Sequence, residues 1–219
     1  MRHETLYRFV LFDLDGTLTD PWEGITRCVQ FALARFGIEE DQENLTTFIG
    51  PPLRESFQVR FGMDEAQAEA AVEAYRERFA TVGLYENRVF DGVEDMLGKL
   101  RDAGTTIALA TSKPEEFARI ILDHFELTPY FDVITGASMS ADRMRKDQVV
   151  EEALRRLGNP SPDEVIMVGD RVHDIEGARA FGIDAIAVSW GYAPDEELPS
   201  AKPAHIVDTL DELEGLLLP

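Results

Sequence analysis

The stretch Phe9-Val10-Leu11-Phe12-Asp13-Leu14-Asp15-Gly16-Thr17 decides how the rest of the chain is interpreted. The apolar run at residues 7–12 is short and rich in aromatic and β-branched residues, which favours a buried β-strand. The polar residues and the glycine that follow predict a loop directly after that strand. Asp13 and Asp15 are two residues apart, so in extended backbone their side chains point to the same face.

From residue 86 onward the sequence alternates between strand and helix patterns. The expected strands span residues 106–110, 133–135, 165–168, 185–188 and 206–207, and the expected helices span residues 91–104, 111–125, 146–157, 174–181 and 209–218. Strands that alternate with helices are typical of a parallel sheet covered by helices on both faces. The predicted fold class is therefore α/β, with a three-layer, Rossmann-like parallel sheet as its core.

Residues 22–82 interrupt this alternation with a block of helical patterns. We expect helices at residues 22–36 and 64–82, and a shorter one that opens near Arg54. A helical block directly after the first strand indicates an inserted all-helical cap domain. The expected domains are a catalytic core of residues 1–18 and 84–219 and a cap of residues 19–83.

The composition limits the classes of partner. The 219 residues include 42 acidic and 21 basic side chains, a formal net charge of −21. Such a charge repels nucleic acids and anionic membranes, because both are bound by neutralising phosphates with Lys and Arg. The single cysteine, Cys28, excludes an internal disulfide. No apolar run reaches the ~18 residues of a membrane span, and the N-terminus lacks a secretory pattern. We expect a soluble cytoplasmic protein, a monomer or a dimer, with no nucleic-acid or membrane partner.

Chemically active residue types follow the expected strands at one edge of the sheet, where ligands bind in parallel α/β folds. These are Asp13 and Asp15 after the first strand, Thr111 and Ser112 after the second, Asp170 and Asp174 after the fourth, and Lys146 before the fourth. Crowded carboxylates need a counterion, and Mg²⁺ prefers oxygen ligands. A metal that faces hydroxyl and ammonium groups forms a cradle for a phosphoryl group. Lys146 and the metal would capture an anionic substrate locally, against the negative field of the whole chain.

Each segment also has an ordinary structural explanation when it is taken alone. An Asp-x-Asp sequence after a strand is usually a loop or a helix cap, and residues 112–115 fit a helix-capping box. A lone lysine such as Lys146 is usually a solvated surface charge. The segment 190–192, after the fifth of these strands, has two interpretations: it borders the site, or it packs between that strand and the last helix, which is the favoured one. The occurrence of the polar segments in order at one sheet edge favours a phosphoryl-transfer site.

This constellation resembles the haloacid dehalogenase (HAD) superfamily of aspartate-nucleophile phosphohydrolases. Residues 13–20 are similar to its first motif, Thr111 to its second, Lys146 to its third and residues 169–174 to its fourth. The resemblance covers essentially the whole chain, and the helical insertion is similar to the family's type 1 cap. The third motif departs from the family pattern, because Lys146 stands between Arg145 and Asp147 without the Lys-Pro pairing common in relatives.

The resemblance implies a role for each matched residue. Asp13 attacks phosphorus, and Asp15 protonates the leaving oxygen and then activates water. The implied Mg²⁺ ligands are Asp13, the Asp15 backbone carbonyl and Asp170, with Asp174 acting through water or a supporting contact. The implied phosphate-binding residues are Gly16, Thr111, Ser112 and Lys146, and Arg54 on the cap is the candidate contact for the leaving group.

Residues 49–57 and 85–92 resemble the phosphoglycolate phosphatase and 5′-nucleotidase-like branch of the superfamily. The expected activity is Mg²⁺-dependent hydrolysis of a small phosphorylated metabolite through an aspartyl phosphate. Phosphoglycolate is the favoured substrate, and nucleoside monophosphates or sugar phosphates are the alternatives. A sugar phosphomutase stays open, since it would keep all four motifs. Dehalogenation is disfavoured because it needs neither Asp15 nor Asp170, and a phospho-aspartate receiver because such modules are shorter and lack the helical insertion.

Overall fold

The computed structural model describes residues 7–139 and 143–218. The chain divides into two compact units. We call them the sheet unit, which comprises Met1–Thr19 and Val89–Pro219, and the helical unit, Asp20–Arg88. None of the helices in the described part of the chain has the length and apolar character of a membrane span.

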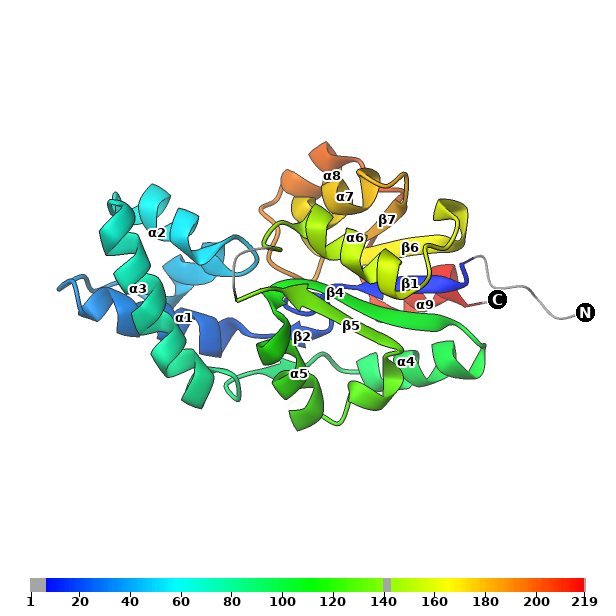
Figure 1. Ribbon diagram of the computed structural model, residues 1–219, viewed down its shortest axis with the longest axis horizontal. Coiled ribbons are helices and arrows are strands. Elements are labelled where there is room, and N and C mark those ends of the chain that lie inside the picture. The colour runs from blue at the N-terminus through cyan, green and yellow to red at the C-terminus, as the bar shows by residue number, and fades with distance from the viewer. Residues whose placement is uncertain (1–6, 140–142, 219) are drawn as a thin grey trace, which may run out of the picture. The chain divides into compact units, whose positions relative to one another are not determined.

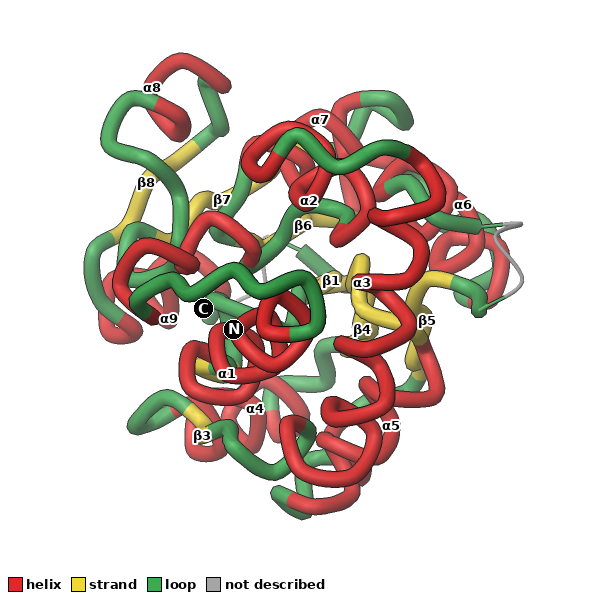
Figure 2. Tube along the Cα trace, turned by 90° about the vertical axis from the view of Figure 1, so that its left-hand side faces the viewer, coloured by secondary structure: helices red, strands yellow, loops and turns green. Residues whose placement is uncertain are grey.

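The sheet unit is built on six parallel strands. Their order is β5 (Val133–Ala137), β4 (Thr106–Pro114), β1 (Phe9–Phe12), β6 (Val165–Gly169), β7 (Asp184–Val188) and β8 (His205–Val207). Figure 2 shows β8 and β5 at opposite ends of the sheet. Phe12 at the end of β1 pairs with Leu109 of β4 and Val168 of β6. The residues that follow these three strands therefore meet at one edge.

Helices cover both faces of this sheet, so the predicted α/β class with three layers is confirmed (Figure 1). One layer contains α4 (Val93–Asp102), α5 (Glu115–His124) and α9 (Leu210–Leu217), and the other contains α6 (Lys146–Arg156), α7 (Val172–Arg179) and the short α8 (Glu197–Ala201). Leu11 of β1 belongs to the buried apolar cluster that Val149 and Ile175 form on α6 and α7. Because side chains alternate along a strand, Asp13 continues the same side of the chain as Leu11.

Two expected helix starts are wrong in detail. The strand predicted at residues 106–110 continues to Pro114, and α5 begins at Glu115 without a side-chain cap, so the capping box expected at residues 112–115 is absent. The residue before a proline avoids helical backbone, which keeps Lys113 extended. Likewise α4 begins after Gly92, which adopts a left-handed φ of 89° and provides no capping side chain.

The helical unit has its own apolar core. It contains α1 (Trp22–Ala34), the 3₁₀ helix η1 (Gln42–Phe48), α2 (Leu53–Phe61), α3 (Glu65–Arg78) and a π-helical turn, η2 (Phe79–Gly83). Phe48 packs edge-on against Phe57, and Tyr75 stacks on Phe79. A capping box between Asp64 and Gln67 starts α3, since each side chain accepts a hydrogen bond from the other residue's backbone amide.

The helical unit covers residues 20–88, whereas the cap expected from the sequence covered residues 19–83. Residues 84–88 belong to it because Glu86 binds two of its helices. The Glu86 carboxylate accepts hydrogen bonds from Arg27 and Arg78, and its carbonyl accepts one from the Gly24 amide. The short strands β2 (Thr19–Asp20) and β3 (Arg88–Val89) pair where the chain passes from one unit to the other.

Candidate active site

A buried lysine connects α6 to the end of β1. Lys146 is the first residue of α6 and is only 6% exposed. Its Nζ donates to Asp13 Oδ1 at 2.8 Å and to the Ala110 carbonyl at 2.8 Å, and it lies 2.6 Å from Asp174 Oδ1. Burial disfavours the ammonium, but the two carboxylates outweigh that effect and raise the pKa of Lys146. Lys146 is therefore a charged group of the sheet edge and not a solvated surface residue.

Three buried aspartates meet at this edge. Asp13, Asp170 and Asp174 each present a carboxylate oxygen, and these oxygens lie within 4.8 Å of one another. Burial, and then the neighbouring Asp174 and Asp13 charges, raise the pKa of Asp170 well above its ordinary value. Burial raises the pKa of Asp174 to about 6, although Lys146 opposes the shift. Such a cluster has the donor type and the unbalanced negative charge that a divalent cation would neutralise.

Two glycines leave room for Asp170. A Cβ atom at Gly16 or at Gly191 would overlap the Asp170 side chain, and Gly16 has a left-handed φ of 82°. The Gly16 amide donates to the Thr19 carbonyl and so closes the loop after β1. Larger residues at these two positions would displace the carboxylate.

The segment 190–192 borders this site, in contrast to the simple packing role favoured from the sequence. The Tyr192 amide donates to Asp170 Oδ2 at 2.8 Å, and Trp190 Nε1 donates to the Thr17 carbonyl. Asp170 Oδ1 is buried and has no hydrogen-bond partner among the described residues. One oxygen of Asp170 is thus fixed by the protein, and the other is available to a ligand.

Asp15 pairs with a lysine that the sequence analysis missed. Lys113 Nζ lies 2.7 Å from Asp15 Oδ2, and both side chains are largely buried. Burial raises the pKa of Asp15, and the Lys113 charge opposes that shift. The spacing of the residues could have indicated this contact. Lys113 is two residues after Thr111, so in the extended end of β4 the two side chains lie on the same face.

Of the remaining expected site residues, Thr111 and Ser112 lie in the last part of β4, and Arg54 lies in the helical unit. Thr111 is buried, and its Oγ1 accepts from the Lys113 amide, while Ser112 is half-buried beside it. Arg54 lies in the first turn of α2 in the helical unit, where it forms ion pairs with Glu65 and Glu69. The role of Arg54 stays a prediction.

The chain belongs to the haloacid dehalogenase-like hydrolase family, whose model matches residues 10–188. It is thus a hydrolase, and the resemblance drawn from its four motifs is confirmed.

Several relatives carry names that specify an activity. A 5′-nucleotidase from Pseudomonas aeruginosa is 47% identical over 212 residues, 96% of each chain. The tyrosine-protein kinase PtkA of Mycobacterium tuberculosis is 41% identical over 96% of this chain and 72% of its own. A phosphoglycolate phosphatase from Pseudomonas aeruginosa is 30% identical over 95% of this chain and 79% of its own. The crystal structure of a predicted phosphatase from Clostridium acetobutylicum has 43% identity and a TM-score of 0.92, over 96% of this chain and 98% of that one.

Proposed function

We propose that this protein is a Mg²⁺-dependent phosphomonoester hydrolase that acts through an aspartyl phosphate on Asp13. The observation that carries the proposal is the charge balance at the sheet edge. Among the described residues, the ammonium groups paired with Asp13, Asp15 and Asp174 are those of Lys113 and Lys146, and Asp170 adds a fourth carboxylate. The neighbouring Arg171 is paired with Glu197. When all four carboxylates are ionised, an excess of two negative charges remains, which one divalent cation neutralises.

The residues present fit such a cation. The donor set consists of oxygens, as Mg²⁺ requires. Asp170 Oδ1 is buried without a partner among the described residues, and the glycine at position 16 lets the Asp170 carboxylate pack against the loop after β1. Asp13 and Asp170 are the proposed direct ligands, together with the Asp15 backbone carbonyl, and Asp174 is the proposed supporting carboxylate. When bound, the cation would neutralise charge on the phosphoryl oxygens and the attacking carboxylate.

Different residues of this chain perform the different chemical steps. Lys146 holds Asp13 Oδ1 and fixes the carboxylate that attacks phosphorus, with the bond to the leaving oxygen breaking as the acyl phosphate forms. Asp15 gives its proton to the leaving oxygen and later takes one from the water that hydrolyses the acyl phosphate. A raised pKa suits Asp15 to the first of these roles, since it favours the protonated carboxyl group. Thr111, Ser112 and Lys146 are the proposed partners of the phosphate oxygens.

Nucleoside monophosphates are the first substrates to test. The relative named 5′-nucleotidase is 47% identical to this chain, whereas the phosphoglycolate phosphatase is 30% identical. This difference reverses the order of preference that the sequence motifs suggested. We further propose, from the resemblance, that the helical unit acts as the cap that selects the leaving group, with Arg54 as its contact.

The test is phosphate release with Mg²⁺ from nucleoside 5′-monophosphates, 2-phosphoglycolate, hexose phosphates and p-nitrophenyl phosphate, with Asp13→Asn as the control. A preferred nucleotide, lost in the variant, would support the proposal, and preference for 2-phosphoglycolate would restore the substrate first favoured. Equal release by wild type and variant would contradict the assignment of Asp13. Because one relative is named a tyrosine-protein kinase, a parallel assay should follow phosphate transfer from ATP to a tyrosine-containing polymer. Transfer without hydrolysis would overturn the proposed function.

A further inference from the structure

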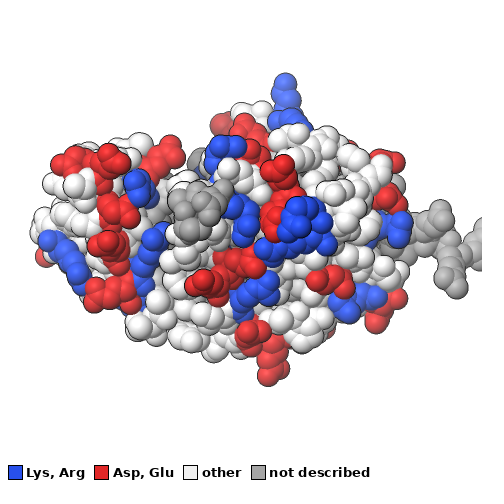
Figure 3. Space-filling model, viewed as in Figure 1, with Lys and Arg blue, Asp and Glu red and all other residues white. Residues whose placement is uncertain are grey.

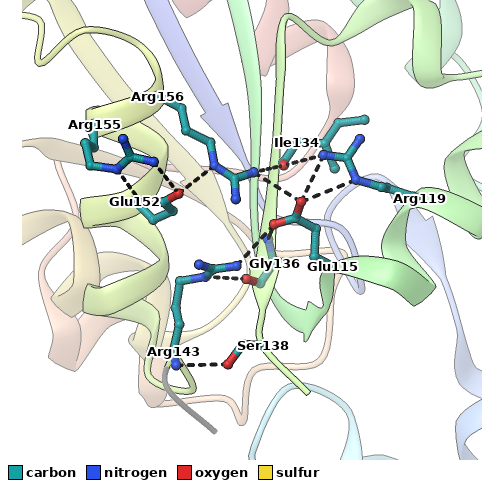
Figure 4. A network of polar contacts seen from close by, with 9 residues as sticks. All are labelled: Glu115, Arg119, Ile134, Gly136, Ser138, Arg143, Glu152, Arg155 and Arg156. Carbon is teal, nitrogen blue, oxygen red and sulfur yellow. Dashed lines mark hydrogen bonds and ion pairs between the residues drawn. The ribbon is translucent and has the colours of Figure 1, made fainter. Parts of the chain in front are cut away.

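One carboxylate joins three arginines on the sheet unit. Glu115 is the first residue of α5, directly after β4. Its Oε1 accepts from Arg119 at 2.9 Å and from Arg156 at 3.1 Å, and its Oε2 accepts from Arg143 at 3.2 Å (Figure 4). Arg119 lies on α5 itself, Arg143 lies in the connection that precedes α6, and Arg156 is the last residue of α6. Glu115 therefore links the end of β4 to the connection before α6 and to the last residue of α6.

The same arginines bind the end of β5. Arg156 and Arg119 both donate to the Ile134 carbonyl, and Arg143 Nε donates to the Gly136 carbonyl at 2.7 Å. Gly136 lies so close to Glu115 that a Cβ atom on it would come within 2.6 Å of the Glu115 backbone. The backbones of β5 and of the β4–α5 junction are thus in contact, and the arginines extend this contact to α6.

In this cluster each arginine is paired with a carboxylate, and two glutamates, Glu115 and Glu152, are each shared by more than one arginine. Arg156 and Arg155 also bind Glu152, one turn earlier on α6. On the face of the sheet unit seen in Figure 3, basic side chains lie beside acidic ones and not in a separate basic area. With their charges paired to carboxylates, the arginines of this cluster serve to fix backbone positions.

These contacts hold the chain on both sides of Lys146, which is the first residue of α6. Arg143 is three residues before Lys146, and the Lys146 Nζ reaches Asp13 across a 2.8 Å hydrogen bond. A hydrogen bond of this length weakens steeply when its donor moves by even 1 Å. The position of α6 along the sheet therefore decides whether Lys146 can hold Asp13.

We propose that Glu115 is a positioning residue, whose carboxylate fixes α6 through Arg143 and Arg156 and thereby holds Lys146 against Asp13. This inference rests on the proposed function for the effect on turnover, but the geometry at Lys146 can be tested without it. Glu115 contacts neither Asp13 nor the aspartate cluster in any hydrogen bond of the described residues. Its side-chain contacts toward Lys146 are those with Arg143, before α6, and with Arg156, at the end of α6.

The experiment compares Glu115→Gln with Glu152→Gln. Each variant keeps the side-chain shape and removes a carboxylate that binds Arg156, but Glu152 links residues of α6 only to one another. We expect kcat of Glu115→Gln to fall at least tenfold with KM within twofold, and kcat of Glu152→Gln to stay within twofold. If Glu115→Gln does not fold, Arg143→Ala, which removes the contacts of this arginine with Glu115 and with the Gly136 carbonyl, should give the same pattern. In a double-mutant cycle, the fold decrease in kcat of the double variant Glu115→Gln/Arg143→Ala should be smaller than the product of the fold decreases of the two single variants.

A second readout does not depend on activity. Limited acetylation of the folded protein, followed by mass spectrometry, should modify Lys146 at least fivefold faster in Glu115→Gln than in wild type or Glu152→Gln. Faster labelling of Lys146 in Glu115→Gln, combined with a wild-type protein that hydrolyses no phosphomonoester, would uphold the positioning role and refute the proposed function. Unchanged labelling together with unchanged kcat would overturn the positioning role, and so would equal effects of the two glutamine variants.

Discussion

Lys113 Nζ lies 2.7 Å from Asp15 Oδ2, and the lysine side chain is 5% exposed. The pair brings a buried cation to the carboxyl group proposed as acid and base, at the end of the strand that also carries Thr111. The second oxygen, Asp15 Oδ1, is buried without a hydrogen-bond partner among the described residues. Lys113 therefore fixes one oxygen of Asp15 and leaves the other for a reacting group.

Lys113→Met should impair the proton transfer that Asp15 performs, because the carboxyl group loses the contact that orients it. The loss should depend on the leaving group. We expect kcat/KM to fall about 100-fold for an alkyl phosphomonoester, within the range of general acid catalysis. For p-nitrophenyl phosphate, whose leaving group needs little protonation, we expect a fall of less than tenfold. Lys99→Met is the control, since Lys99 pairs with Glu214 at an exposed site. Equal losses for the two substrates would argue against this role of Lys113.

The stability of the metal-free protein should rise as the pH falls from 7.5 to 5.5. A carboxyl group with a raised pKa binds its proton more tightly in the folded state than in the unfolded state, so protonation favours folding. Asp174, with a pKa of about 6, titrates within this range, and Asp170 and Asp15 are shifted in the same direction. Thermal unfolding in EDTA should therefore show a higher Tm at pH 5.5.

Protonation also relieves charge repulsion throughout a chain of net charge −21. A control variant, Asp170→Asn, separates this general effect from the protonation of the aspartate cluster. Asp170→Asn should raise the Tm at pH 7.5 and reduce the change in Tm between the two pH values. The measurements stay above pH 5, because carboxylates with lowered pKa values, such as Glu115, lose stabilising ionisation in more acidic solution. A Tm that falls on acidification in EDTA would be inconsistent with the arrangement of the cluster.

Mg²⁺ should stabilise the wild-type protein against heat. A ligand at 100 times its dissociation constant contributes about 2.7 kcal/mol to the folded state, which for a chain of this size corresponds to roughly 5–10 °C in Tm. Asp170→Asn should abolish the shift, because it removes a proposed ligand whose free oxygen faces the cluster. Asp163→Asn, at an exposed 3₁₀ helix of the sheet unit, should leave it intact. A shift that survives Asp170→Asn would place the cation elsewhere.

Glu86 should be important for the stability of the helical unit. Its side chain is 17% exposed and accepts hydrogen bonds from Arg27 and Arg78, so Arg78→Ala removes half of a partly buried pair. The expected cost is roughly 1–3 kcal/mol in the free energy of unfolding, as for the loss of hydrogen bonds to a charged group, with Arg27 remaining as a partner of Glu86. Arg88→Ala, which breaks an exposed pair with Asp20, should cost less than about 1 kcal/mol. Urea denaturation of the two variants measures the difference, and equal costs would show that burial at Glu86 contributes little.

Gly16→Ala tests the close packing of the loop after β1 against Asp170. The substitution places a Cβ against the Asp170 carboxylate, and it also demands a left-handed φ that alanine adopts at a cost of roughly 1–2 kcal/mol. We expect a lower Tm together with loss of the Mg²⁺ shift. Gly37→Ala is the matched control, because Gly37 has a φ of 70° and nothing near its missing Cβ. Loss of the shift in the control as well would show that strain and not space is responsible.

The sequence by itself determined the architecture. Short continuous apolar runs and intervening helical patterns specify the parallel sheet, because strands that helices cover on both faces are buried on both faces. Asp13, Asp170 and Lys146 could also be assigned to one edge. The two aspartates directly follow strands, parallel strands end together, and Lys146 begins the helix that leads to the fourth strand. Even the boundaries of α6 and β6 were close to those expected, as their apolar patterns begin and end sharply.

The tertiary structure decided which side chains touch. That Lys113 binds Asp15 depends on the strand β4 continuing to Pro114, where local preference alone suggested the start of a helix. The contacts of the segment 190–192 with Asp170 and Thr17 join residues that are distant in the chain, so no local pattern could reveal them. The same holds for Glu115, whose three arginines come from α5, α6 and the connection before it. Hydrogen bonds and ion pairs are short-range, so their partners are fixed only once packing has placed the elements that carry them.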